Sequence, residues 1–320
     1  MTTTPLPPQG VVASEPGEVG DGLVAGPPAG AERPLQRRAR IAAKGLSSPW
    51  ASLAAVIIAL LWTTPTLGLL VTSFRPELDI RTSGWWTALS GGWTMSNYDT
   101  AMFGNQTNLI GYFVNSLVIT LPAVVIPISI ALLAAYAFAW IDFKGKEILF
   151  VAVFALQIVP IQITLIPLLQ QYVNWNINGT FWTVWLSHSM FALPLAIFLL
   201  HNFMREIPPS LVEAARVDGA GHVKIFFQVL LPLLVPAIAS FAIFQFLWVW
   251  NDLLVSLTFA GGLPNVAPLT VRVAELAGTR GADWHLLSAG AFISMIVPMI
   301  VFLALQRYFV RGLLAGSVKG

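Results

Sequence analysis

The chain has 320 residues, of which 56% are hydrophobic and only 10% are charged, and its formal net charge is +2. Soluble globular chains carry roughly 25% charged residues, so this composition indicates a membrane protein. With no cysteine, the sequence excludes disulfides, thiol nucleophiles and cysteine metal sites. No metal site is expected either from the four histidines, which lack a ligand spacing: His188, His201, His222 and His285.

Residues 1–45 are predicted to form a disordered cytoplasmic tail. The first part is rich in proline and glycine and has too little apolar surface to form a core. It also lacks the basic start and the apolar run of a signal peptide. Its end carries a basic cluster suited to lipid phosphates rather than to nucleic acid, formed by Arg33, Arg37, Arg38, Arg40 and Lys44.

Residues 46–309 contain six apolar segments long enough to cross a hydrocarbon core of about 30 Å as helices. The predicted spans are 50–73, 111–139, 148–170, 181–203, 233–259 and 286–308. Each contains at least one proline, which leaves a carbonyl that neighbouring helices, side chains or water must satisfy. We therefore predict an all-α protein with a kinked bundle of six transmembrane helices.

The basic residues predict that both termini are cytoplasmic. In that orientation all 17 lysines and arginines lie inside except Arg75, Arg81, Arg272 and Arg280, as the positive-inside rule requires. Residues 74–110 and 260–285 then form outer loops. The tryptophans of the first loop are interpreted as membrane-interface anchors or as sugar-stacking rings; they are Trp85, Trp86 and Trp93.

Residues 208–232 form the longest polar interruption between apolar segments, and they are predicted to be a cytoplasmic helical hairpin. Ser210 and Glu213 have the spacing of a capping box, which predicts a helix from about Leu211. Asp218-Gly219 should end this helix, because glycine accepts the positive φ of a helix C-terminus, and Gly221 loosens the turn.

A second hairpin helix should follow and end near Leu231-Pro232. Its apolar residues recur at the spacing of one helix face and are Val223, Phe226, Phe227 and Leu230.

The sequence indicates transport rather than catalysis. It contains no phosphate-binding P-loop, so neither ATP nor Mg is expected on this chain. Aromatic rings can stack on a sugar while amides and carboxylates take its hydroxyls. The candidate substrate pathway therefore comprises Asn115, Gln157, Gln245, Trp248, Asn251 and Asp252. The alternative for Asn251-Asp252 is that they cap or bridge helices near the outer end of the fifth span.

The hairpin resembles the EAA loop of permease subunits of bacterial ATP-binding-cassette importers. The resemblance rests on Glu213-Ala214-Ala215, Gly219 and Leu231-Pro232. It implies that the residues coupling this chain to an ATPase are Glu213, Ala214, Ala215, Asp218, Gly219, Gly221 and Pro232. In the family a glycine-rich cytoplasmic tail also reaches the ATPase, here residues 310–320 with Gly312, Gly316 and Lys319.

Other patches look like the maltose- and α-glucoside-type permeases of the bacterial inner membrane. They include Asn97-Tyr98, Asn115-Ser116, the run 134–139, Ile166-Pro167-Leu168, Trp250-Asn251 and the ending 309–320. The resemblance implies a second permease subunit, two ATPase subunits that hold ATP and Mg, an extracytoplasmic sugar-binding protein, and alternating access. Ser83-Gly84-Trp85-Trp86 resembles the α-glucoside members and points to a disaccharide.

Three alternatives remain open. An importer of the same family for a polyol or glycerol phosphate would have the same features. A secondary carrier is disfavoured because Asp252 is the only carboxylate well inside a predicted span, whereas ion-coupled carriers hold several ionisable groups near the midplane. A membrane scaffold protein is the third.

Overall fold

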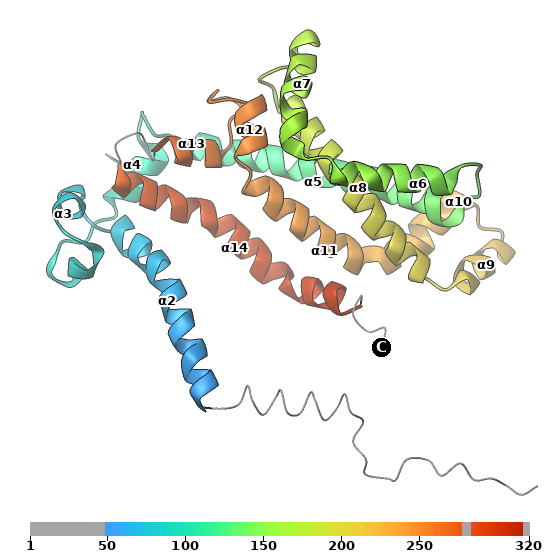
Figure 1. Ribbon diagram of the computed structural model, residues 1–320, viewed down its shortest axis with the longest axis horizontal. Coiled ribbons are helices and arrows are strands. Elements are labelled where there is room, and N and C mark those ends of the chain that lie inside the picture. Colours follow the sequence, from blue (N-terminus) through green and yellow to red (C-terminus); the bar gives the residue numbers. More distant parts are fainter. Residues whose placement is uncertain (1–48, 277–282, 316–320) are drawn as a thin grey trace, which may run out of the picture. The chain divides into compact units, whose positions relative to one another are not determined.

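The computed structural model describes residues 49–276 and 283–315, and within these ranges every regular element is a helix (Figure 1). This confirms the predicted all-α class. The tail 1–45 lies outside the described residues. The chain divides into two compact units, Met1–Thr63 and Thr64–Gly320, and the first long helix begins in one unit and ends in the other.

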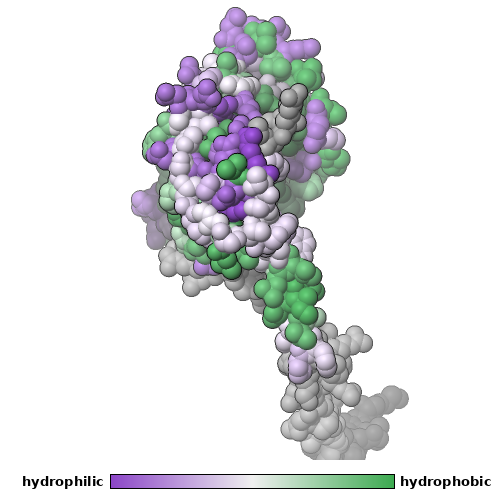
Figure 2. All heavy atoms as spheres, turned by 90° about the vertical axis from the view of Figure 1, so that its left-hand side faces the viewer, coloured by the Kyte–Doolittle hydropathy of each residue, from purple (hydrophilic) through white to green (hydrophobic). Residues whose placement is uncertain are grey.

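Among the described residues, five helical segments are long and apolar enough to cross a membrane. They correspond to α2 (Pro49–Ser73), α5 (Leu109–Trp140), α8 (Phe181–Glu206), α11 (Leu231–Trp250) with the helical turns before it, and α14 (Trp284–Ala315). A stretch of α2 is strongly hydrophobic at its surface (Figure 2), with Leu53, Val56, Ile57, Ile58, Leu60 and Leu61 exposed, as expected for a helix in contact with lipid or another apolar helix.

The predicted third span, 148–170, is a broken pair of helices rather than one helix. The segment Lys146–Ile158, which comprises α6 (Lys146–Ala155) and the 3-10 helix η2 (Leu156–Ile158), is bent by 99° from α7 (Ile161–Asn174). Val159 is extended, because the ring of Pro160 disfavours helical backbone in the residue before it. Counted as one span, the pair gives the sixth crossing that the sequence predicted.

The predicted fifth span, 233–259, is too long. Helix α11 ends at Trp250, and a short helix α12 (Leu254–Phe259) starts after a turn. The Asp252 carboxylate accepts hydrogen bonds from the backbone N–H groups of Val255 at 3.2 Å and Ser256 at 2.8 Å, so it caps a new helix. After α13 (Leu269–Leu276), α14 continues to Ala315, so residues 310–315 are helical rather than part of a separate tail.

Three helix prolines have a side-chain donor from another helix at the carbonyl that they leave without a backbone partner. Pro127 of α5 cannot donate to the carbonyl of Ala123, and the buried amide of Gln245 on α11 donates to that carbonyl at 3.1 Å. In the same way, the Trp185 indole N–H donates at 3.0 Å to the carbonyl of Val118, which Pro122 leaves without a partner. The Trp250 indole N–H donates at 3.0 Å to the carbonyl of Ser294, which Pro298 leaves without a partner. These bonds connect α5, α8, α11 and α14.

The segment between α2 and α5 is ordered by an arginine buried inside it. Three short helices follow one another: α3 (Glu77–Thr82), the 3-10 helix η1 (Trp85–Ser90) and α4 (Ser96–Phe103). Arg75 is 1% exposed and donates to the carbonyls of Asp79 and Ser83. Trp85, Trp86 and Trp93 are all exposed, which is compatible both with interface anchors and with sugar-stacking rings.

Candidate translocation and coupling sites

Two cavities lie at the break between α6 and α7. One, of about 390 Å³, is lined by residues 156–160 at the break together with Gln162, Thr164 and Phe191. The other, of about 220 Å³, extends toward α11, and both share Gln157, Ile161 and Phe191. Polar backbone exposed at membrane depth is tolerated where it lines a water-filled cavity or is covered by protein, so this break is a candidate for a solute path.

The smaller cavity brings together three of the six predicted pathway residues. Gln157 of η2 faces Gln245 and Trp248 of α11 across it, although almost 90 positions separate them in the chain. The Gln245 amide nitrogen already donates to Ala123, which leaves its carbonyl oxygen as an acceptor. None of the residues that line either cavity is charged.

The other three predicted pathway residues line neither cavity. Asn115 donates to the carbonyls of Pro264 and Ala267 and so holds the loop before α13 on α5. Asn251 donates to the carbonyl of Leu247 at the end of α11. Asp252 caps α12, so the capping alternative describes the contacts of both residues.

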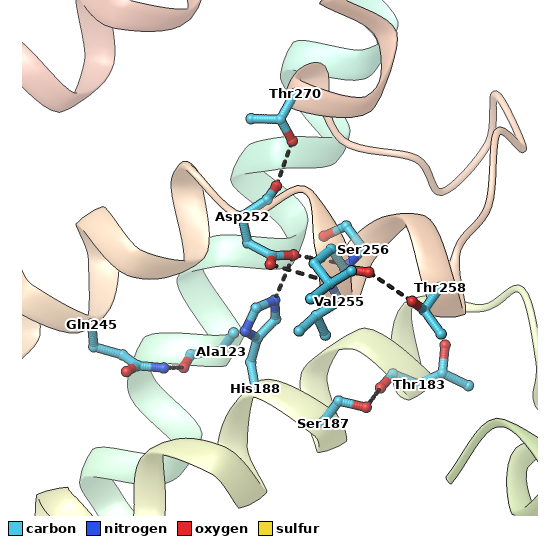
Figure 3. A network of polar contacts seen from close by, with 11 residues as sticks. Ala123, Thr183, Ser187, His188, Gln245, Asp252, Val255, Ser256, Thr258 and Thr270 are labelled. Atoms are coloured by element: carbon cyan, nitrogen blue, oxygen red, sulfur yellow. Dashed lines mark hydrogen bonds and ion pairs between the residues drawn. The ribbon is translucent and has the colours of Figure 1, made fainter. Parts of the chain in front are cut away.

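Asp252 also faces a buried histidine, as Figure 3 shows. The Nε2 atom of His188 on α8 lies 3.5 Å from Oδ2 of Asp252, and the His188 side chain is fully buried. The ring of Trp248 meets the His188 ring edge-on at 5.4 Å between centroids. Thr270 donates to the Asp252 carbonyl at 2.6 Å, so this turn joins α8, α11, α12 and α13.

Replacing Asp252 by alanine should lower the free energy of unfolding by about 2 kcal/mol, because both the α12 cap and the acceptor beside His188 are lost. Asp252→Asn keeps one carboxamide oxygen and should lose less. Thermal unfolding of the purified protein measures both. Asp142→Ala serves as the control, since Asp142 is fully exposed and pairs with Lys146 only at the surface. An Asp252→Asn protein as unstable as Asp252→Ala would contradict the capping role.

The hairpin presents its predicted coupling residues outward except Ala215, which is half-buried against the main hydrophobic cluster. Helix α9 (Pro209–Val217) buries Val212 and leaves Glu213, Ala214 and Val217 exposed, with Val217 87% exposed. Residues 213, 214 and 217 lie on one face because a helix returns every three to four residues. Gly219 follows with φ +78°, as expected for the residue that ends the helix, and Asp218, Gly221 and Pro232 are also exposed.

The capping box was a wrong prediction. Helix α9 starts at Pro209, with Pro208 as its cap, and no side chain caps it. Proline suits the first helical position because its missing N–H would be unpaired there anyway.

The second hairpin helix also differs from the prediction. Residues His222–Lys224 (α10) lead into a π-helix, η3 (Ile225–Leu230), and this wider helix does not keep four apolar residues on one face. Phe226 and Leu230 are buried, whereas Val223 and Phe227 are exposed.

The predicted contacts of the C-terminal tail fall mostly beyond the described residues. Gly312 lies in α14, and Gly316 and Lys319 lie outside the described range. In the part of the chain that the structure describes, no group of three or more histidines or carboxylates is placed to hold a metal ion.

Sequence reasoning missed three residues that make contacts between helices. Trp185 and Trp250 each donate a hydrogen bond to a carbonyl that a proline leaves without a backbone partner. Tyr136 contacts the hairpin through a hydrogen bond with His222. The position four residues before each proline was the available signal, since it identifies the carbonyl that needs a donor. Which side chain supplies that donor was not visible in the sequence.

Several membrane-spanning helices, a broken helix lined by uncharged polar groups and an exposed polar hairpin define a membrane transport subunit. Residues 88–314 match the family described as the binding-protein-dependent transport system inner membrane component, and the chain belongs to this family.

Two relatives support this assignment. The chain is 53% identical over 270 residues to the osmoprotective compounds uptake permease protein GgtD of Synechocystis sp., covering 83% of this chain and 91% of that protein. It is 38% identical to the alpha-glucoside transport system permease protein AglG of Rhizobium meliloti, covering 85% of this chain and 97% of that protein. The relatives are permeases, so this chain is a transport component of the inner membrane and not an enzyme.

A solved structure shares the fold. A chain of a bacterial ABC transporter involved in the import of the acidic polysaccharide alginate superposes with a TM-score of 0.69 at 19% identity, over 87% of this chain and 99% of that chain.

Proposed function

We propose that this chain is one permease subunit of an ATP-driven importer for a neutral sugar, an α-glucoside or a similar disaccharide. The observation that carries the proposal is the uncharged lining of the two cavities, where amides, a hydroxyl and aromatic rings meet at a broken helix. Rings suit the apolar face of a sugar, and amides suit its hydroxyls. The similarity to AglG, whose name states alpha-glucoside transport, supports the same class.

The energy for transport is proposed to enter through the hairpin 208–232. In the predicted orientation, with both termini in the cytoplasm, the outward face of α9 meets a cleft of a partner ATPase chain that holds ATP and Mg. Closure of two such clefts rotates the kinked bundles, so that the path opens alternately to the two sides. The exposed face of α9 with Glu213, Ala214 and Val217 supports this role, because these side chains are accessible to a partner.

A second permease subunit is proposed to cover the break between α6 and α7. Ile158 is 80% exposed next to the extended Val159, and unwound backbone at membrane depth cannot face lipid. A partner across a water-filled path satisfies both the apolar side chain and the polar backbone. The complete importer then has two permeases, two ATPases and an extracytoplasmic sugar-binding protein.

The uncharged cavities also distinguish the alternatives. A glycerol phosphate importer would need cationic groups along the path, and neither cavity offers one. A polyol is uncharged and is therefore compatible with both cavities. The similarity to GgtD, which is named for the uptake of osmoprotective compounds, is consistent with such a substrate.

The first test is to purify the tagged chain gently and identify the proteins that accompany it. An ATPase, a second permease and a sugar-binding protein are expected. A chain isolated alone, from membranes in which other complexes survive, would favour a secondary carrier or a scaffold.

Replacing Gln157 by leucine should slow uptake of the sugar about fivefold, because one hydrogen bond to a hydroxyl is lost on the path. The matched control is Gln170→Leu on α7, an exposed glutamine that lines neither cavity. Uptake of radiolabelled α-glucoside by cells with equal amounts of each variant measures the effect. Equal rates for both variants would remove Gln157 from the path, and competition by glycerol phosphate would contradict a neutral substrate.

A further inference from the structure

One side-chain hydrogen bond connects the hairpin directly to the long helix α5. The hydroxyl of Tyr136, one turn before the end of α5, lies 2.7 Å from Nδ1 of His222, the first residue of α10. Either partner can be the donor, depending on the imidazole tautomer, and the contact is a hydrogen bond in both cases. The Tyr136 ring also meets the Phe226 ring edge-on at 5.4 Å.

The same region is packed into the main core. Tyr136, Val212, Ile225, Phe226 and Leu230 belong to one hydrophobic cluster that continues along α5 and α8. The buried side of the hairpin therefore rests on the membrane bundle, while its outer side, with Glu213 and Val217, is exposed.

The hairpin backbone departs from regular α-helix on both sides of His222, with glycines before it and a π-helix after it. Gly219 has φ +78°, and neither Gly219 nor Gly221 has a neighbour within 4 Å of the position of a Cβ atom. Beyond His222 the chain enters the π-helix Ile225–Leu230, a form that is rare and is frequently found at functional sites. A push on α9 could therefore be absorbed by bending at the glycines or at the π-helix before it reached α5.

We propose that Tyr136 is a positioning residue for energy coupling, and that its hydrogen bond to His222 holds the hairpin on α5 so that motion of α9 becomes motion of α5. The inference rests on the proposed role of the hairpin as the contact with the ATPase. Helix α5 is suited to pass the motion on. Its proline-broken carbonyls are bound by Trp185 of α8 and Gln245 of α11, and Gln245 lines the smaller cavity.

The test is Tyr136→Phe in the complete transporter, reconstituted in lipid with its binding protein. The ring and its packing against Phe226 stay, and only the hydroxyl is removed. Loss of one hydrogen bond changes an equilibrium by about fivefold, so the number of sugar molecules imported per ATP hydrolysed should fall by about that factor. ATP hydrolysis itself should continue, since the ATPase sites are on other chains.

Tyr172→Phe is the matched control. The Tyr172 hydroxyl also lies in a side-chain hydrogen bond between two helices, 3.0 Å from Oγ of Ser187, but this bond joins α7 to α8 and does not contact the hairpin. Its ratio of transport to hydrolysis should stay at the wild-type value. An unchanged ratio for Tyr136→Phe, or an equal fall for both variants, would overturn the role of Tyr136.

Variants of His222 test the bond from its other side. His222→Asn places an oxygen near the position of Nδ1 and should restore most of the ratio that His222→Ala loses. Combining His222→Ala with Tyr136→Phe should cost no more than His222→Ala alone, because the bond that Tyr136→Phe removes is already absent. Additive losses would reject the bond as the cause.

The wild-type complex separates this inference from the function on which it rests. If sugar and binding protein do not stimulate its ATP hydrolysis, the proposed function fails and the role of Tyr136 fails with it. If they do, a normal Tyr136→Phe variant rejects only the positioning role.

Discussion

Uptake should be lost when Gly219 is replaced by proline, while the protein still reaches the membrane. Gly219 has φ +78°, and its N–H donates to the carbonyl of Arg216 at 2.9 Å. Proline fixes φ near −65° and has no N–H, so this conformation should cost about 3 kcal/mol. The population of correctly formed hairpin should then fall about a hundredfold. Uptake of labelled sugar, normalised to the amount of protein in the membrane, measures the result.

Gly145→Pro is the matched control for this prediction. Gly145 has φ +81° and open space around it, like Gly219, but it lies in the turn between α5 and α6 and not in the hairpin. Both substitutions force φ away from a similar positive value, but only the one at Gly219 lies in the hairpin, so uptake should suffer far more there. Equal losses would indicate general misfolding, and normal transport by Gly219→Pro would show that the hairpin is not the coupling element.

Replacing Gln245 by leucine should lower the free energy of unfolding by about 1–3 kcal/mol, because the buried carbonyl of Ala123 loses its donor. The loss depends on Pro127, which is the reason that this carbonyl lacks a backbone partner. With Pro127→Ala in the background, the alanine N–H can donate to Ala123 in the ordinary helical pattern, so Gln245→Leu should cost less than half as much. Denaturant or thermal unfolding in lipid nanodiscs measures the four proteins.

Pro122→Ala provides the control background. It lies one and a half turns earlier in α5, and the carbonyl that it frees belongs to Val118 and is bound by Trp185. Removing this proline leaves the Ala123 carbonyl unchanged, so the full cost of Gln245→Leu should remain. A cost that is the same in all three backgrounds would show that Gln245 stabilises the bundle through something other than the carbonyl freed by Pro127.

Much of the fold was predictable because the signals are local. A membrane span is recognised from about 20 consecutive apolar residues, and a helix end from a glycine that accepts positive φ. The span 111–139 and the helical termination at Gly219 were therefore read from the sequence, and α5 and the end of α9 follow them closely. The orientation of the termini rests on the charge distribution and stays a prediction.

The sequence was ambiguous where a local pattern had more than one solution. Pro160 could kink a span or break it, and the structure shows a bend of 99°. Asp252 could face a solute or cap a helix, and its carboxylate accepts backbone hydrogen bonds from Val255 and Ser256. Ser210 and Glu213 had the spacing of a capping box, but Pro209 already starts the helix.

The sequence by itself determined a helical membrane protein with a polar hairpin, and it identified the proline carbonyls that would need partners. Only the tertiary structure decided which groups meet: Gln245 with Ala123, His188 with Asp252, and Tyr136 with His222. These partners lie between 64 and 122 positions apart in the chain. Apolar periodicity specifies which face of a helix is buried, whereas the atom that a buried donor reaches depends on how the helices pack against one another.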